Sequence, residues 1–328
     1  MAHIHGKSNC TKFLLNGVRP INGKKPATLA ELHHLYDNYK AILNETALRV
    51  TQKQDDLILS LSNDESRLDR QIADDIAKRT IEVESHIQDL HDKIEAGDSM
   101  IRTTGYLLRY AFACLLSSHR IHSPSAGAVR ELSNIRYRKE KTIANKSSTV
   151  TNECNNIKKS YDFLKEKESF LIGADGEEFV IHTLTQLPDE YHIVNDVNLH
   201  FDRAIHWREQ NEWIKNCQID HVVVGPTGIF LLETKNWKSS DIELKSKDLR
   251  HQVRRSSLGF WFYLKDHYTF ERSPKTRSVI VSMKGNPSGN KPDKYIDVVS
   301  PYQLCRYISG RPAVLDENAI KKVVNTIS

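Results

Sequence analysis

Residues 218–237, QIDHVVVGPTGIFLLETKNW, contain two strand-like runs joined by a tight turn. Apolar residues dominate Gln218–Val224 and Gly228–Asn236, and the sequence GPTG at 225–228 supplies the turn between them. The stretch therefore predicts a β-hairpin. The hairpin places Asp220 near the start of the first strand and Glu233 near the end of the second, where their side chains can meet.

Charged side chains are unusual in strands as apolar as these. Glu233 and Lys235 lie on one face, because side chains alternate along a strand. A carboxylate beside an apolar sheet is unfavourable unless a metal ion or a partner charge compensates it. One interpretation is a salt bridge of Lys235 with Glu233 or Asp220 at the rim of the sheet.

The other interpretation is a metal site. Asp220, Glu233 and the Thr234 carbonyl offer the oxygen ligands that Mg²⁺ prefers. A bound ion lowers the pKa of its water, and Lys235 could orient that water or stabilise negative charge at phosphorus. The pattern thus favours phosphodiester cleavage. His221, next to Asp220, points to the opposite face, so we expect it to be structural.

Short alternating elements surround this hairpin and predict a single central sheet covered by helices. The expected elements are a helix at 173–187, strands at 191–199, 218–224 and 228–236, a helix at 247–266, a strand at 277–283, and helices at 301–308 and 317–327.

Four motifs occur together in a fixed order: GADGE at 173–177, NDV at 195–197, QIDH at 218–221 and GIFLLETKNW at 228–237. In this combination residues 170–310 resemble a NERD (nuclease-related) domain, a branch of the PD-(D/E)XK nuclease superfamily. The resemblance implies an α/β fold with a restriction-endonuclease-like αβββαβ core and a central mixed sheet.

The resemblance also implies site roles. Asp220 and Glu233 would be metal ligands, Lys235 the catalytic lysine, and Glu177 a further acid. Gln252 is the natural match to a polar residue on the helix after the hairpin. The implied activity is that of a Mg²⁺- or Mn²⁺-dependent endonuclease acting on DNA, with a role in bacterial DNA processing or anti-phage defence. Composition shows nothing of that role.

Basic residues follow the hairpin. Residues 235–265 carry 8 Lys and Arg against 3 Asp and Glu. We expect Lys238, Arg250, Arg254 and Arg255 to contact phosphates, although a solvated helix face is the alternative.

The segment HFDRAIHWREQNEWIKNC at 200–217 is longer than expected between the first two strands. It is either a substrate-facing flap or a loop packed by Trp207 and Trp213.

The first half of the chain predicts long helices. An apolar stripe at spacings of three, four and seven runs through Thr28–Gly97, as in a coiled coil, and a second helix should run from Ala128 to about Leu171. The apolar run Tyr106–Leu116 is about half a membrane span and predicts a buried helix.

Charge separates the two arms of this half. Residues 31–98 hold 16 acidic and 8 basic side chains, whereas residues 99–172 hold 6 acidic and 13 basic ones. Opposite charge favours an antiparallel hairpin within one chain, and pairing between subunits is the alternative.

We therefore expect an N-terminal segment (1–27), an all-α coiled-coil region for oligomerisation or sensing (28–171) and a nuclease-like domain (172–328). Expected partners are DNA, a second copy of the chain through the helices, and a protein partner or activator, with no membrane span. The five scattered cysteines and the absence of a secretory signal favour a reducing cytoplasm. Alternative functions are a non-catalytic nucleic-acid-binding scaffold with a nuclease fold, or a coiled-coil interaction protein.

Overall fold

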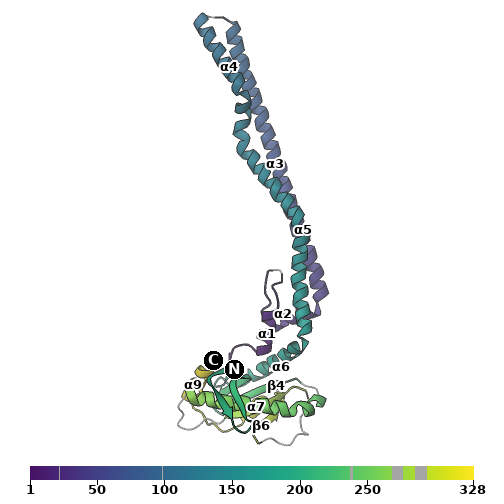
Figure 1. Cartoon of the computed structure of the whole chain (residues 1–328), viewed down its shortest axis with the longest axis vertical. Coiled ribbons are helices and arrows are strands. Elements are labelled where there is room, and N and C mark those ends of the chain that lie inside the picture. Colours follow the sequence, from purple (N-terminus) through teal and green to yellow (C-terminus); the bar gives the residue numbers. More distant parts are fainter. Residues whose placement is uncertain (22, 98, 237–238, 268–275, 285–293) are drawn as a thin grey trace. The chain divides into compact units, whose positions relative to one another are not determined.

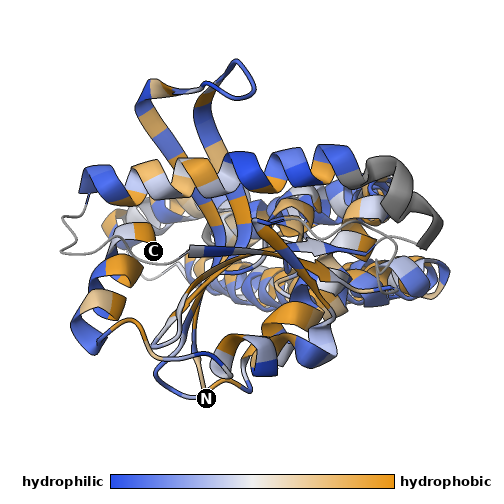
Figure 2. Ribbon diagram, turned by 90° about the horizontal axis from the view of Figure 1, so that it is seen from below, coloured by the Kyte–Doolittle hydropathy of each residue, from blue (hydrophilic) through white to orange (hydrophobic). Residues whose placement is uncertain are grey.

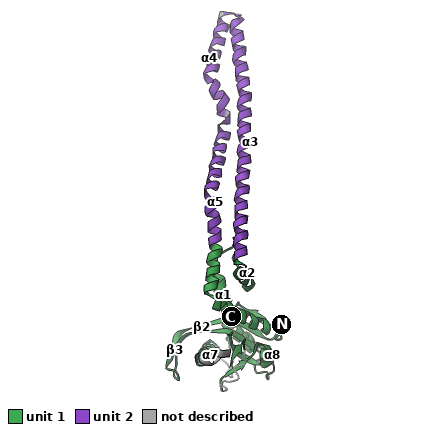
Figure 3. Ribbon diagram, turned by 90° about the vertical axis from the view of Figure 1, so that its right-hand side faces the viewer, with its two compact units in different colours: residues 1–39, 156–328 green, residues 40–155 purple. Residues whose placement is uncertain are grey.

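A computed structural model gives the fold. It describes residues 1–328 except 22, 98, 237–238, 268–275 and 285–293, and it also leaves out the side chains of residues 100, 124 and 239–246. The chain forms two compact units (Figure 3): the sheet unit, Met1–Tyr39 with Asn156–Ser328, and the hairpin unit, Lys40–Asn155. These boundaries differ from the three expected segments, because the N-terminal segment folds together with the sheet.

In the described part of the sheet unit, six strands form a mixed sheet, side by side in chain order. β1 pairs with β2 in parallel, β2, β3 and β4 form an antiparallel meander, and β4, β5 and β6 are parallel neighbours. The strands are β1 (His3–His5), β2 (His192–Trp207), β3 (Glu212–Gly225), β4 (Gly228–Lys235), β5 (Thr276–Ser282) and β6 (Ile296–Val299).

Helices complete the sheet unit (Figure 1). The order α6, β2, β3, β4, α7, β5 confirms the expected αβββαβ core, to which β1 and β6 are added. The helices are α1 (Asn9–Gly17), α2 (Leu29–Asp37), α6 (Glu168–Leu184), α7 (Ser239–His267), α8 (Pro301–Ser309) and α9 (Glu317–Ile327).

Alternation along the central strands supplies apolar side chains to both faces of the sheet. Val222 and Val224 pack in one buried cluster with residues of α7 and α9, such as Phe260. Val223 and Phe230 pack in a second cluster with residues of α6 and α8. The sheet is therefore the middle layer of an α/β/α arrangement, and β3 and β4 are covered on both faces, which explains their unbroken apolar sequence (Figure 2).

The hairpin unit is built from α3 (Tyr39–Glu95), α4 (Met100–His122) and α5 (Ala126–Glu166). Arg136 of α5 lies 2.9 Å from both Glu65 and Asp69 of α3, and Lys139 also pairs with Glu65. The acidic and basic arms thus pair within one chain as an antiparallel hairpin. Among the described residues, no helix combines the length and apolar content needed to cross a bilayer.

Two expectations were wrong. The apolar run Tyr106–Leu116 is helical but not buried: Leu108 and Leu115 of α4 are 70% and 80% exposed. A hairpin of two arms covers only one face of each helix, so the other apolar side chains face outward. Residues 200–217 are not a loop, because β2 and β3 continue through them as a strand hairpin.

Candidate functional site

Asp220 and Thr234 join the two central strands where their regular pairing ends. The last pair of the β3–β4 ladder is His221 with Leu232. Just beyond it, the backbone N–H of Thr234 donates to Asp220 Oδ2 at 2.8 Å. The backbone carbonyl of Lys235 accepts from the backbone N–H of Met283, on the β5 side of β4. Because backbone groups alternate in direction along a strand, the N–H and the carbonyl of Thr234 both point toward β3. The Thr234 carbonyl and the Asp220 carboxylate therefore face the same side, as a shared ion would require.

Glu233 holds Lys235 and Gln252 in place. Its Oε1 accepts from Lys235 Nζ at 2.6 Å and from Gln252 Nε2 at 2.8 Å. The Glu233 side chain is 6% exposed and that of Lys235 23%. Gln252 comes from α7, so the expected contact between this helix and the hairpin is present. The salt bridge that the sequence left open exists between Glu233 and Lys235, inside the cluster that contains Asp220.

Glu177 reaches the same cluster from α6. It is buried, and its Oε2 accepts the backbone N–H of Cys10, in the first turn of α1, at 3.2 Å. The positive end of a helix dipole therefore faces a site carboxylate. The neighbouring Glu178 accepts from Thr11 Oγ1 of the same helix. The structure thus brings together all five expected site side chains: Glu177, Asp220, Glu233, Lys235 and Gln252.

Three carboxylates, Asp220, Glu233 and Glu177, crowd negative charge into this cluster. Although Asp220 keeps some exposed surface, burial of its carboxyl group, followed by repulsion from Glu233 and Glu177, raises its pKa well above the usual value. Burial opposes the charge of Lys235, but attraction to Glu233 and Asp220 outweighs it and raises the pKa of the ammonium group. Lys235 is therefore a permanent cation at neutral pH, suited to stabilising negative charge and not to accepting a proton.

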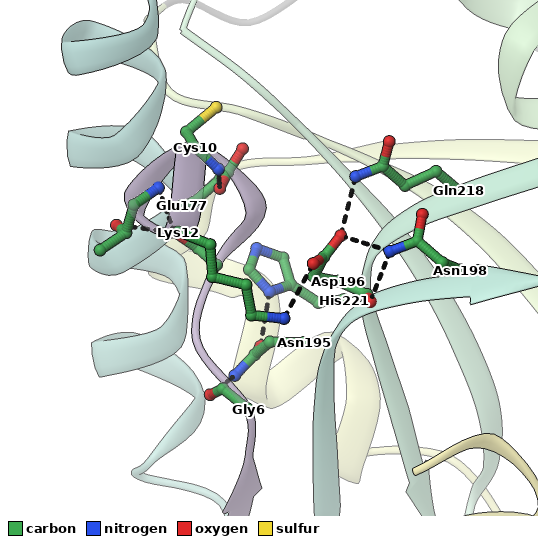
Figure 4. A network of polar contacts seen from close by, with 11 residues as sticks. Gly6, Cys10, Lys12, Glu177, Asn195, Asp196, Asn198, Gln218 and His221 are labelled. Carbon is green, nitrogen blue, oxygen red and sulfur yellow. Dashed lines mark hydrogen bonds and ion pairs between the residues drawn. The ribbon is translucent and has the colours of Figure 1, made fainter. Parts of the chain in front are cut away.

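Residues near the N-terminus form a second polar network beside the site, which the sequence did not reveal (Figure 4). Asp196 stands across from Asp220, between the pairs Asn195–His221 and Val197–Ile219. Its carboxylate accepts from Lys12 Nζ, Gln218 Nε2 and Asn198 Nδ2, each at 2.8 Å, and its φ of 54° lies in the left-handed region. Asn195 and Asp196 stood out as a motif, but nothing local predicted that α1 would supply Lys12.

His221 lies on the opposite face from Asp220, as alternation requires. It is fully buried, and burial lowers its pKa to about 3. Its Nδ1 lies 2.8 Å from Asn195 Oδ1, whose amide group donates to the Gly6 carbonyl. A neutral imidazole that donates to Asn195 ties β3 to β2 and the N-terminal segment, which is a structural role.

The donor set fits a hard divalent cation held by few protein ligands. Among the described residues, no three His, Cys, Asp or Glu side chains form a ready-made metal cluster. Mg²⁺ does not need one, because it keeps several waters and binds through one or two carboxylates. Asp220 and Glu233 supply those carboxylates, and their crowding beside Glu177 leaves negative charge that one lysine does not neutralise.

Three of the four basic residues that we expected to contact phosphates lie in the described part of the chain. Arg255 lies 2.7 Å from Glu212 of β3, and Arg254 stacks over the Tyr295 ring at 5.7 Å. Arg250 is partly exposed on α7, whereas Lys238 lies outside the described residues.

Comparison with protein-family models gives a match. A family model described as a nuclease-related domain, NERD, matches residues 172–274. No curated protein matches the chain. The matched range carries Glu177, Asp220, Glu233, Lys235 and Gln252, and it leaves out α1, β5 and both arms of the hairpin unit. Over residues 172–274 this chain is therefore similar to a nuclease-related domain, NERD.

Proposed function

We propose that the sheet unit is a metal-dependent endonuclease that hydrolyses phosphodiester bonds, with DNA as its substrate. The convergence of Asp220 and Glu233 with a charged Lys235 at the ends of β3 and β4 carries this proposal. Asp220, Glu233 and the Thr234 carbonyl would hold Mg²⁺ or Mn²⁺. When bound, the ion supplies Lewis acidity that activates a water and offsets charge at the phosphoryl group.

The protein's own residues orient this chemistry. Thr234 fixes one oxygen of Asp220, and Gln252 fixes one oxygen of Glu233, so both carboxylates are preorganised. Lys235 donates from Nζ and stabilises negative charge that develops at phosphorus. The first turn of α1 holds Glu177 at the edge of the cluster, where its carboxylate can orient the attacking water.

A cleavage assay tests the proposal. Plasmid, linear duplex, single-stranded DNA and RNA are incubated with the full chain in Mg²⁺ or Mn²⁺, alongside Asp220→Ala and Lys235→Ala. We expect cleavage by the wild type and a loss of at least about a hundredfold in each variant, as for removal of one preorganised stabilising group. Equal cleavage by wild type and variants would refute the site. No cleavage of any substrate would support a non-catalytic scaffold or the need for an activator, and DNA binding without cleavage would point to the scaffold.

We also propose self-association through α4. Ile101, Leu108, Phe112 and Leu115 leave large apolar surfaces exposed on this helix, and such surfaces commonly mark interfaces. Light scattering should show that Leu108→Glu with Leu115→Glu lowers the mass of the particle. Leu48→Glu, at an exposed leucine of α3, is the control that should leave the mass unchanged. A monomeric wild type would exclude the interface.

Cellular context is part of the same proposal. The resemblance to nuclease-related domains supports a role in bacterial DNA processing or anti-phage defence, with a partner or activator as the signal. The five cysteines are all free thiols, which supports a reducing compartment such as the cytoplasm.

A further inference from the structure

A second cleft lies on the sheet unit, between α7, the end of the β2–β3 hairpin and the starts of β5 and β6. Its volume is about 790 Å³, within the range of ligand sites. Trp207 and Arg208 line it from the hairpin, and Arg254 and Trp261 line it from α7. Tyr295, the residue before β6, completes the lining named here. Figure 2 shows the β2–β3 hairpin extending past α7.

One face of α7 builds the helical wall of this cleft. Arg254, Ser257, Leu258 and Trp261 line it, and these positions are three, four and seven residues apart, so they form one stripe. Gln252, which contacts Glu233, lies on the adjoining part of the same helix. A helix rises 1.5 Å per residue, so Arg254 and Trp261 lie about 3 Å and about 14 Å farther along the axis than Gln252. Two residues turn about 200° around a helix, so Gln252 and the cleft stripe face opposite sides of α7, a helix diameter of about 10–12 Å apart.

Two aromatic rings of the cleft are accessible, and each lies beside a cation. Trp261 is 37% exposed and Tyr295 66%. Lys265 lies 5.2 Å from the centre of the Trp261 ring, and Arg254 and Lys294 each lie 5.7 Å from that of Tyr295. Trp207, by contrast, is buried and stacked on His251, which makes it a firm floor.

Rings beside cations match the chemistry of an unpaired nucleotide. The flat face of a ring stacks on a base, and the adjacent ammonium or guanidinium group neutralises its phosphate. Bases within a duplex are already stacked on their neighbours and cannot enter such a cleft. Among the described residues that line the cleft, Glu209 is the one acidic residue, and Arg208 and Arg254 are two basic ones.

We propose that this cleft binds unpaired nucleotides of a nucleic-acid strand that also reaches the proposed cleavage site around α7. The inference rests on the proposed nuclease function, because the strand held here is the one presented to Asp220 and Glu233. It makes the preferred substrate a nucleic acid with a single-stranded segment. It also gives the long β2–β3 hairpin a substrate-facing role, carried by Trp207 and Arg208 at its end.

Binding without metal tests the cleft separately from catalysis. Fluorescence anisotropy in EDTA measures binding of the full chain to three ligands: an oligonucleotide of about 20 thymidines, one of about 20 uridines, and a duplex of equal length. These ligands are longer than the binding sites of single-strand binding domains, which span roughly 4–16 nucleotides. The variants are Tyr295→Ala and Trp261→Ala. Tyr302→Ala is the matched control, since this tyrosine is 86% exposed on α8 and outside the cleft.

We expect each cleft variant to weaken single-strand binding by about 5- to 150-fold, the usual effect of removing one stacking ring. The control should bind single strands like the wild type, and duplex binding by the cleft variants should change by less than twofold. Comparison of the thymidine and uridine oligonucleotides shows whether DNA or RNA is preferred. Absence of single-strand binding by the wild type, or unchanged binding in both cleft variants, would overturn the proposal. Metal-dependent cleavage together with unchanged variants would refute the cleft and support the nuclease. Weakened variants without any cleavage would support the cleft and point to a scaffold or a missing activator.

Discussion

Replacing Lys235 by methionine in the metal-free protein should destabilise the sheet unit by about 3 kcal/mol. Lys235 Nζ lies 2.6 Å from Glu233 Oε1, and the Glu233 side chain is 6% exposed. Removing one partner of a buried ion pair leaves the other charge uncompensated, which costs about 3–5 kcal/mol. The lower end applies, because Lys235 is 23% exposed and Gln252 continues to donate to Glu233.

This loss is large enough to be measured as a change in Tm. For a unit of the size of Met1–Tyr39 with Asn156–Ser328, 1 kcal/mol shifts Tm by about 2–4 °C, so the expected decrease is about 6–12 °C. All four tryptophans, at positions 207, 213, 237 and 261, lie in this unit. Tryptophan emission during heating in EDTA at pH 8 therefore reports the sheet unit alone.

A second substitution identifies the cause. Glu233→Gln, added to Lys235→Met, removes the uncompensated charge and should recover at least half of the lost Tm. Lys321→Met, which breaks an exposed pair on α9, should leave Tm unchanged. If the double variant were no more stable than Lys235→Met, the lysine would stabilise the fold through packing of its stem, and the argument from charge would be refuted.

Two further predictions concern the carboxylate cluster and α1. Asp220→Asn should raise Tm in EDTA at pH 8. The folded-state pKa of Asp220 is raised, so its ionised carboxylate opposes folding above that pKa. The gain in Tm should therefore shrink as pH falls toward 4. An equal gain at all pH values would contradict this explanation. Gly17→Ala should cost about 1–3 kcal/mol and reduce cleavage, because the added methyl group would lie 2.0 Å from the Phe163 ring and displace α1; Gly105→Ala, with open space around it, should be neutral or stabilising in a thermal melt. Normal stability and activity of the Gly17 variant would show that α1 does not hold the site.

Much of the sheet unit could be predicted because its signals are local. The turn at 225–228, the alternation that puts Glu233 and Lys235 on one face, and the amphipathic helix 317–327 are each specified by a few adjacent residues. The site side chains followed from the same hairpin together with the resemblance to a nuclease-related domain.

The parts that the sequence missed depend on contacts across long separations. β1 has three residues and pairs with His192–Val194, so no local pattern could assign its partner. The same is true of α1, which brings Cys10 to Glu177 and Lys12 to Asp196. The apolar run of α4 was predicted to be buried, because hydropathy reports how apolar a helix is and not whether a partner covers it.

Binding of Mn²⁺, followed by electron paramagnetic resonance of the free ion, tests the central claim most directly, because it requires neither a substrate nor an activator. We predict one bound ion per wild-type chain. Asp220→Asn should weaken binding more than about tenfold, since even outer-shell partners change metal affinity by about 10–100-fold. No Mn²⁺ binding by the wild type, or equal affinity in Asp220→Asn, would contradict a metal site at the ends of β3 and β4.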